Sequence, residues 1–271
     1  MDGDSNRLDV DTVRLSGSLL ILLFSFELFF VLLDIVVNYF EVIEYNSIQR
    51  LCNIAREDGL AAWFMTSQTM VAALVLWFLW WLSRKQEGIS SFYRRGWLVL
   101  ALFFTYLSAD DGALIHERLG TMFEDMIDKS GTAAGPGGLA SWLDMFPSYE
   151  WQLLLPFFIG MGLFVLYFLW KVLGPGRPLF MVLAAFTCLA MAVVLDFIEG
   201  MDADHSLNIY SWLKQAYLLE DYTVDHFAKS LEEFLEMFGI SLFLSVFVAQ
   251  IHALLPESFA ICFHDSRKTG G

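Results

Sequence analysis

Six stretches of this chain are apolar for long enough to cross a lipid bilayer. The hydrocarbon layer of a bilayer is about 30 Å thick, and a helix needs about 20 residues to cross it. Of the 271 residues, 57% are hydrophobic, which is more than an ordinary soluble domain uses. Within hydrocarbon a helix satisfies all of its own backbone amides, so helices are the expected spanning elements. The stretches run over residues 17–40, 61–83, 96–115, 151–174, 178–199 and 230–255.

The expected fold is all-α: a polytopic transmembrane helix bundle of about six spans that forms a single domain over residues 1–271. The sequence PGRP at 175–178 predicts a tight turn, because Pro and Gly both stop helices. The fourth and fifth stretches would then form a helical hairpin. Residues 132–138 are expected to form a flexible loop, and residues 208–222 an amphipathic segment on the outer membrane surface.

The Lys and Arg residues of the short connections predict the orientation of the bundle, because such residues are retained on the cytoplasmic side. In a six-span bundle most of them fall on one side, which places both termini in the cytoplasm. Arg50 and Arg56 lie on the opposite side, in a loop that they share with several acids. Reporter fusions at Gly88 and Gly176 are expected to be cytoplasmic, and a fusion at Gly135 external. The basic residues on the cytoplasmic side are Arg7, Arg14, Arg84, Lys85, Arg94, Arg95, Lys171, Arg177, Arg267 and Lys268.

Composition excludes some functions and leaves others open. A net charge of -15 argues against nucleic acid as a partner, because phosphate binding needs a basic face. Cys52, Cys188 and Cys262 have neither metal-site spacing nor the pattern of a disulfide framework. The acidic N-terminus, with no small-residue cleavage site after the first stretch, predicts that no signal peptide is removed. Membrane lipid is the expected partner of the apolar surface.

Carboxylates inside the spans are the most informative residues. In the first stretch Glu27, Asp34 and Glu41 are spaced seven and seven residues apart, so they share one helix face. Gly112 would let the third helix bend and bring the acids and the histidine of its last turns closer together. The third stretch ends in Asp110, Asp111, His116 and Glu117, the fifth in Asp196 and Glu199, and the sixth opens with His226, Glu232, Glu233 and Glu236.

The predicted topology brings these acids to one depth. The first, third and fifth helices run outward and the sixth runs inward, so the acids gather in the outer third of the bilayer. Glu27 lies deeper, roughly 15 Å into its helix at about 1.5 Å per residue, close to the midplane. An isolated carboxyl at that depth is expected to be neutral, because hydrocarbon disfavours its charged form.

Ionised carboxylates in hydrocarbon need compensation, since each costs on the order of 2.5–3.5 kcal/mol even on the lenient insertion scale. Lys229 has the spacing to pair with Glu232 or Glu233, and Arg118 with a neighbour. That is too little positive charge for the acids at this level. A bound divalent metal or shared protons would supply the rest.

Carboxylates with histidine form the ligand sets of Zn, Fe and Mn, and the sequence does not distinguish among these metals. Neither a Glu-x-x-His pair nor a His-Glu-x-x-His motif is present, so a site would have to be assembled across helices. Glu117 and Glu236 are candidates for a catalytic general base, and Glu27 and Asp34 for a proton path. The candidate metal ligands are Asp110, Asp111, His116, Asp196, Glu199, Glu232 and Glu233.

Each candidate also has a structural interpretation. Acids at span ends, such as Glu117, Glu199 and Glu232, would be solvated at the interface, and acids at a helix start are favourable there in any case. This interpretation is weaker for Asp34 and weakest for Glu27, because nothing near the midplane solvates a carboxyl.

Three segments of the chain resemble a group of uncharacterised bacterial polytopic membrane proteins. They are REDGLAAWF at 56–64, LSADDGALIHERLG at 107–120 and EEFLEMFG at 232–239. In that group an Arg-Glu segment with Trp precedes the second span, and a Leu-Ser-x-Asp-Glu…His-Glu segment ends the third. Asp111 stands where the group more often has Glu. The resemblance implies a multi-pass protein of the bacterial inner membrane. It implies no particular activity.

Three functions remain open on the sequence alone. The first is a metal-dependent membrane enzyme that acts on a lipid-soluble substrate. The second is a non-catalytic subunit of a larger membrane complex, whose acidic outer loops would dock a basic partner. The third is a proton- or cation-coupled transporter, in which Glu27 would be the next group on a path inward from the outer acids. The spans show no internal repeat, which argues against a transporter.

Overall fold

The structure is a computed structural model that describes residues 7–130, 149–201, 203, 205, 207–255 and 259–262. The predicted loop at 132–138, and Arg267 and Lys268 of the C-terminal segment, lie outside the described residues. Helices make up most of the described chain, as the apolar stretches predict.

The elements follow the predicted order along the chain. The helices are α1 (Thr12–Asp34), continued by a short π-helix η1 (Ile35–Tyr39), then α2 (Asn46–Cys52), α3 (Leu60–Lys85), α4 (Ser91–Ala113), α5 (Ile115–Ser130), α7 (Tyr149–Leu173), α8 (Arg177–Glu199), α9 (Ile209–Tyr217) and α10 (Asp221–Leu254). Two short strands, β1 (Arg7–Val10) and β2 (Phe259–Cys262), pair antiparallel.

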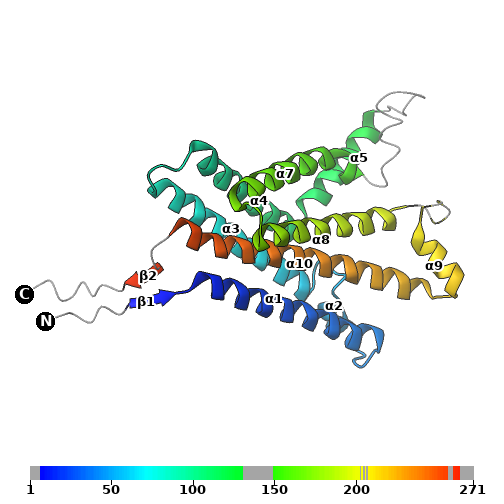
Figure 1. Cartoon of the computed structure of the whole chain (residues 1–271). Coiled ribbons are helices and arrows are strands. Elements are labelled where there is room, and N and C mark those ends of the chain that lie inside the picture. Colours follow the sequence, from blue (N-terminus) through cyan, green and yellow to red (C-terminus); the bar gives the residue numbers. More distant parts are fainter. Residues whose placement is uncertain are drawn as a thin grey trace, which may run out of the picture.

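The helices confirm a multi-pass membrane bundle. Five of them are long and apolar enough to cross a bilayer, and six when the bent pair α4 and α5 counts as one span. The central helix is α10, which packs against α1, α3 and α8 (Figure 1). Pairing of β1 with β2 places the two ends of the described chain together, while α2, α5 and α9 lie toward the opposite end of the bundle (Figure 1).

The third span is bent by 74° between α4 and α5. The bend lies at Leu114 rather than at Gly112, where the sequence predicted it. Leu114 adopts a left-handed φ of 52°, and its N–H donates to the Asp110 carbonyl at 2.7 Å, which closes the last turn of α4. The Asp110 carboxylate then accepts the His116 N–H at 2.8 Å and caps α5. Asp110 therefore accepts hydrogen bonds on both sides of the bend, with its carbonyl at the end of α4 and its carboxylate at the start of α5.

The sixth span begins earlier than predicted, at Asp221 instead of residue 230. Its first turns are polar, so the apolar stretch begins later along the chain than the helix does. In the structure His226 and Ser230 are buried against α1, because they have polar partners there. The predicted amphipathic segment at 208–222 contains the short helix α9, with Tyr210 buried and Trp212 exposed.

An aromatic core holds α4, α7 and α10 together. Its largest buried side chains include Trp97, Phe104, Phe168 and Phe243. Gly96 permits the closest approach: a Cβ atom there would lie 1.9 Å from the Phe168 ring, which is fully buried. The ring therefore occupies the space that a side chain on α4 would need.

Gly96→Ala is expected to destabilise the protein by about 1–3 kcal/mol, because overpacking forces a buried ring out of its position. The change would be measured as a loss of unfolding free energy in detergent. Gly160→Ala on α7 is the matched control, since nothing lies within 4 Å of its Cβ position. Equal stability of the two variants would contradict the packing at Gly96.

Candidate functional site

The buried face of α1 is mainly polar. Its buried residues are Thr12, Ser16, Glu27, Phe30 and Asp34. The facing side of α10 offers hydroxyl and imidazole groups to three of them. We call this interface the α1–α10 seam. At one end of the seam Ser16 and Ser245 exchange hydrogen bonds with each other's hydroxyl and carbonyl groups, at 2.8–3.0 Å. Such bonds join helices in lipid, where apolar contact alone gives little preference for one partner.

Glu27 lies within the seam, fully buried at 0% exposure. Its Oε1 accepts hydrogen bonds from the Ser241 hydroxyl and from the Gln68 amide of α3, and Gln68 also donates to Ser241. Glu27 Oε2 and Gln68 Oε1 are buried with no hydrogen-bond partner. Three helices thus meet at one carboxyl group that retains an unused oxygen.

Asp34 forms the second polar group of the seam and is 1% exposed. Its Oδ2 lies 2.8 Å from His226 Nε2 and 3.3 Å from the Ser230 hydroxyl of α10. Its Oδ1 accepts a hydrogen bond of 2.9 Å from the side-chain amide of Asn38, which lies in η1. Both carboxylate oxygens are therefore partnered, in contrast to those of Glu27.

Three carboxylates from α8 and α10 form a compact group, which we call the acidic cluster: Asp196, Glu199 and Glu232. One oxygen of each lies within 4.8 Å of the other two, close enough to hold a metal ion. Glu232 is 4% exposed, and its Oε2 is buried without a partner. Lys229 lies against the cluster, with its Nζ 2.7 Å from Glu232 Oε1 and 3.8 Å from Asp196 Oδ1.

Further acids extend the acidic cluster across α10. Glu236 lies within electrostatic range of Asp196, and also of Asp111 and His116 at the α4–α5 bend. Glu233 interacts electrostatically with Glu236 and Lys229. The predicted gathering of acids from several helices therefore occurs around α10, with Lys229 as the cation among them.

The histidine of the α4–α5 bend belongs to a separate pair. His116 Nδ1 lies 3.0 Å from Asp110 Oδ2. Asp111, the neighbouring acid, accepts instead from the Thr69 hydroxyl of α3 at 3.3 Å. Among the described residues, the group with metal-ligand geometry includes neither Asp110 nor His116. The acids that were expected to gather at one depth therefore form two groups, and Glu236 lies in electrostatic range of both. Glu117 lies half-buried on α5, in electrostatic range of His116.

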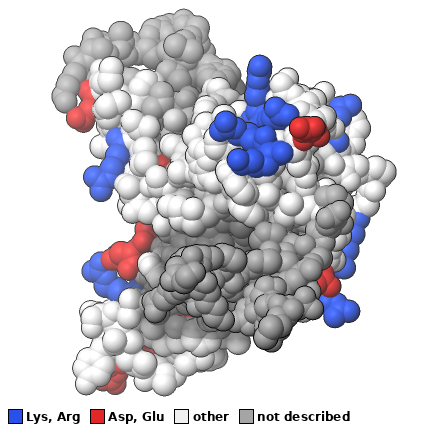
Figure 2. Space-filling view, turned by 90° about the vertical axis from the view of Figure 1, so that its left-hand side faces the viewer, with Lys and Arg blue, Asp and Glu red and all other residues white. Residues whose placement is uncertain are grey.

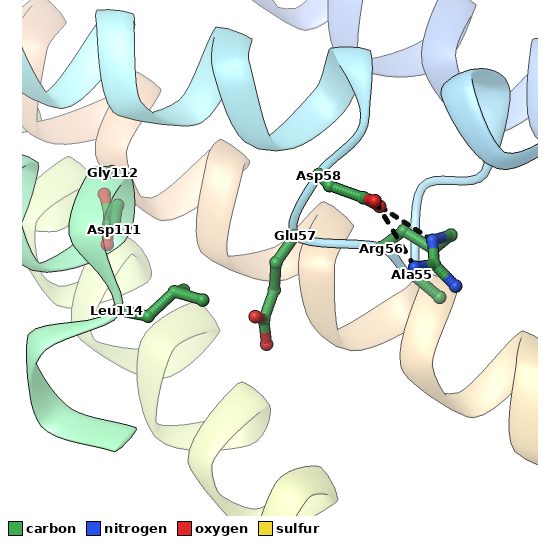
Figure 3. A pocket seen from close by; sticks show the side chains of 7 residues that line it. All are labelled: Ala55, Arg56, Glu57, Asp58, Asp111, Gly112 and Leu114. Atoms are coloured by element: carbon green, nitrogen blue, oxygen red, sulfur yellow. Dashed lines mark hydrogen bonds and ion pairs between the residues drawn. The ribbon is translucent and has the colours of Figure 1, made fainter. Parts of the chain in front are cut away.

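A cleft of about 370 Å³ opens beside Asp111. Figure 3 shows Asp58 bound to Arg56, while the Glu57 carboxylate points away from that pair. Arg56 and Arg50 hold the pKa of Asp58 down at about 2, so the ion pair stabilises the fold above the ordinary pKa of an aspartate and is lost as the pH falls through about 2. The lining residues are Ala55, Arg56, Glu57, Asp58, Asp111, Gly112 and Leu114.

Sequence reasoning missed three side chains that complete these groups: Gln68, Ser241 and Asn38. Ser241 and Asn38 are lone polar residues within apolar stretches, and Gln68 belongs to the polar run TSQT at 66–69. Gln68 carried the clearest signal, because an amide in the middle of a span costs energy unless another helix provides a partner.

The sequence model for the family described as "Domain of unknown function (DUF8692)" matches residues 14–251, which include every group described above. No curated protein and no solved structure matches the chain.

Proposed function

Given that the chain belongs to the family described as a domain of unknown function (DUF8692), we propose from its own residues that it is an integral membrane protein that binds a divalent cation between α8 and α10. The ligands are Asp196, Glu199 and Glu232, whose oxygens lie within 4.8 Å of one another. This proximity is the observation that supports the proposal. An oxygen-only ligand set favours Mn²⁺ over Zn²⁺ or Fe²⁺.

Charge balance is the second argument for a cation. Glu233 and Glu236 lie close to the acidic cluster, and among the described residues Lys229 is the positive side chain that forms an ion pair with it. Like charges at this spacing repel strongly where water is scarce. A divalent cation would relieve the repulsion, and the buried Glu232 Oε2 is available as a ligand atom.

Mn²⁺ binding by the purified protein tests the proposal. After equilibrium dialysis, wild type is expected to retain Mn²⁺, and Glu199→Gln to bind it at least about tenfold more weakly, because a charged ligand is lost. Glu220→Gln is the matched control, since Glu220 is an exposed carboxylate at the start of α10. Equal binding by wild type and Glu199→Gln would overturn the proposal.

The cleft beside Asp111 favours an enzymatic use of the cation. It opens next to the α4–α5 bend, and Asp111 and Glu236 lie in electrostatic range of each other. A lipid-soluble substrate could enter from the bilayer, with the metal as Lewis acid or activator of water. Glu236, in electrostatic range of Asp196, would then be the general base, and Glu117 the alternative on α5.

The α1–α10 seam favours proton- or cation-coupled transport as a second candidate function. Glu27 lies within α1 with one oxygen unpartnered, and Ser16, which bonds to Ser245, lies near the start of the same helix, next to β1 in the chain. Intramembrane carboxyls of this kind mark ion and proton paths in many membrane proteins. Asp34 lies on the same face, seven residues away, bound to His226.

Glu27→Gln separates these two uses. The amide matches the protonated acid in size, so folding and Mn²⁺ binding are expected to be unchanged. In vesicles that contain a pH-sensitive dye, a coupled transporter would lose its Mn²⁺-driven pH change, because glutamine cannot release a proton. Glu220→Gln should behave as wild type. Proton movement that persists in Glu27→Gln would argue for the enzyme, and failure to fold would show that the carboxyl is a structural acceptor for Ser241 and Gln68.

The membrane and the orientation of the protein are part of the same proposal. We place the protein in the bacterial inner membrane with both termini cytoplasmic, on the basis of the basic residues near the α3–α4 and α7–α8 connections. Reporter fusions at Gly88 and Gly176 test the orientation. A role as a subunit of a larger membrane complex is compatible with a bound cation; it would be supported if the protein purified from native membranes carried further chains.

A further inference from the structure

A second cleft, at the α3–α4 connection, has a cationic lining. Its volume is about 420 Å³. Figure 2 views the molecule from the end that carries β1 and β2, where Lys and Arg side chains gather on the surface. We call this cleft the arginine cleft. The residues that line it are Trp80, Arg84, Ser91, Arg94 and Arg95.

The arginines of this cleft, Arg84, Arg94 and Arg95, form no salt bridge within the part of the chain that the structure describes. By contrast, Arg50, Arg56, Lys214 and Lys229 are all paired with acids. Unpaired arginines are notable in a chain with a net charge of -15.

The Arg84 and Arg94 guanidinium groups are held in place, and Arg94 keeps an unused donor. The Arg84 guanidinium lies over the Trp80 ring at 5.1 Å, a cation–π contact that fixes its plane. Arg94 donates to the Gln86 carbonyl at 3.4 Å, while its Nε is buried with no partner. A buried donor without a partner costs free energy, so an acceptor in the cleft would be favoured.

We propose that the arginine cleft binds the phosphate group of an anionic ligand. Arginine forks match phosphate oxygens with paired hydrogen bonds, and the Ser91 hydroxyl adds a further donor. The cleft lies at the ends of two membrane-spanning helices, where the exposed apolar side chains of Trp81 and Phe92 can contact acyl chains. This position favours a phospholipid headgroup over free phosphate, since basic pockets at helix ends bind anionic lipids.

Lipid retention in native mass spectrometry tests the proposal. The full chain is placed in nanodiscs of phosphatidylcholine with added phosphatidylglycerol, and released with its bound lipid. Wild type is expected to retain phosphatidylglycerol, and the double variant Arg84→Gln/Arg95→Gln to bind it at least about tenfold more weakly. Both arginines are exposed, so the fold should persist, and circular dichroism checks this. Arg177→Gln, at the start of α8, is the control.

A second arm uses inorganic phosphate. If millimolar phosphate displaces the lipid from wild type, and binds to wild type but not to the double variant, the site recognises phosphate itself. If only the lipid binds and the double variant loses it, the headgroup is recognised together with its chains. Both results support the proposal. Equal lipid retention by wild type and the double variant, or an equal loss in Arg177→Gln, would overturn it.

Discussion

His226→Ala is expected to lower the free energy of unfolding by about 1–3 kcal/mol, because the buried Asp34 carboxyl loses one of its hydrogen-bond partners. Asp34 and His226 lie 2.8 Å apart and are 1% and 7% exposed, so no water replaces the lost imidazole. Titration of the protein in mixed micelles with a denaturing detergent, followed by circular dichroism, gives the measurement.

A double-mutant cycle with Asp34→Asn isolates the interaction between the two side chains. His252→Ala is the matched control, because His252 lies on the same helix and is exposed. Neutral hydrogen bonds between helices in a membrane contribute up to about 1.7 kcal/mol. A coupling energy near zero would contradict a direct hydrogen bond between Asp34 and His226.

Lys229→Met is expected to raise the affinity for Mn²⁺ at least about tenfold, or about 1.4 kcal/mol. The Lys229 ammonium lies 2.7 Å from Glu232 and 3.8 Å from Asp196, so it competes with a metal for the same oxygens. Its removal leaves the carboxylates intact and without compensation, which makes a divalent cation more favourable. Methionine retains much of the length and apolar volume of the lysine stem.

The affinity is measured by electron paramagnetic resonance of free Mn²⁺. Lys214→Met is the control, since Lys214 is also paired with acids, Asp225 and Asp221, outside the acidic cluster. If Lys229→Met bound Mn²⁺ as weakly as wild type, or lost binding altogether, Lys229 would be a structural partner of Glu232 rather than a competitor of the metal.

The spans could be predicted from the sequence because hydrocarbon thickness and backbone hydrogen bonding leave few alternatives. The burial of Glu27 and Asp34 could also be predicted, because the free-energy cost of a carboxyl that faces lipid is too high. Helical spacing also predicted that Lys229 pairs with Glu232 or Glu233, and in the structure it donates to Glu232.

Which acids lie next to one another in the structure could not be predicted as well as the spans could. Which acids meet depends on how each helix is rotated about its own axis, and apolar stretches in lipid constrain this weakly. His116 was expected to join the carboxylates of other helices, but the left-handed turn at Leu114 pairs it with Asp110. Gln68 and Ser241 were missed because neutral polar residues within a span carry no charge signal.

Crystals soaked in Mn²⁺ test the central claim most directly, because anomalous scattering locates the metal without reference to activity. We predict one difference peak between α8 and α10, at about 2.2 Å from an oxygen of each of Asp196, Glu199 and Glu232, with Lys229 displaced from Glu232. No peak at this position, with the Lys229–Glu232 pair intact, or a peak bound to Asp110 and His116 instead, would contradict it.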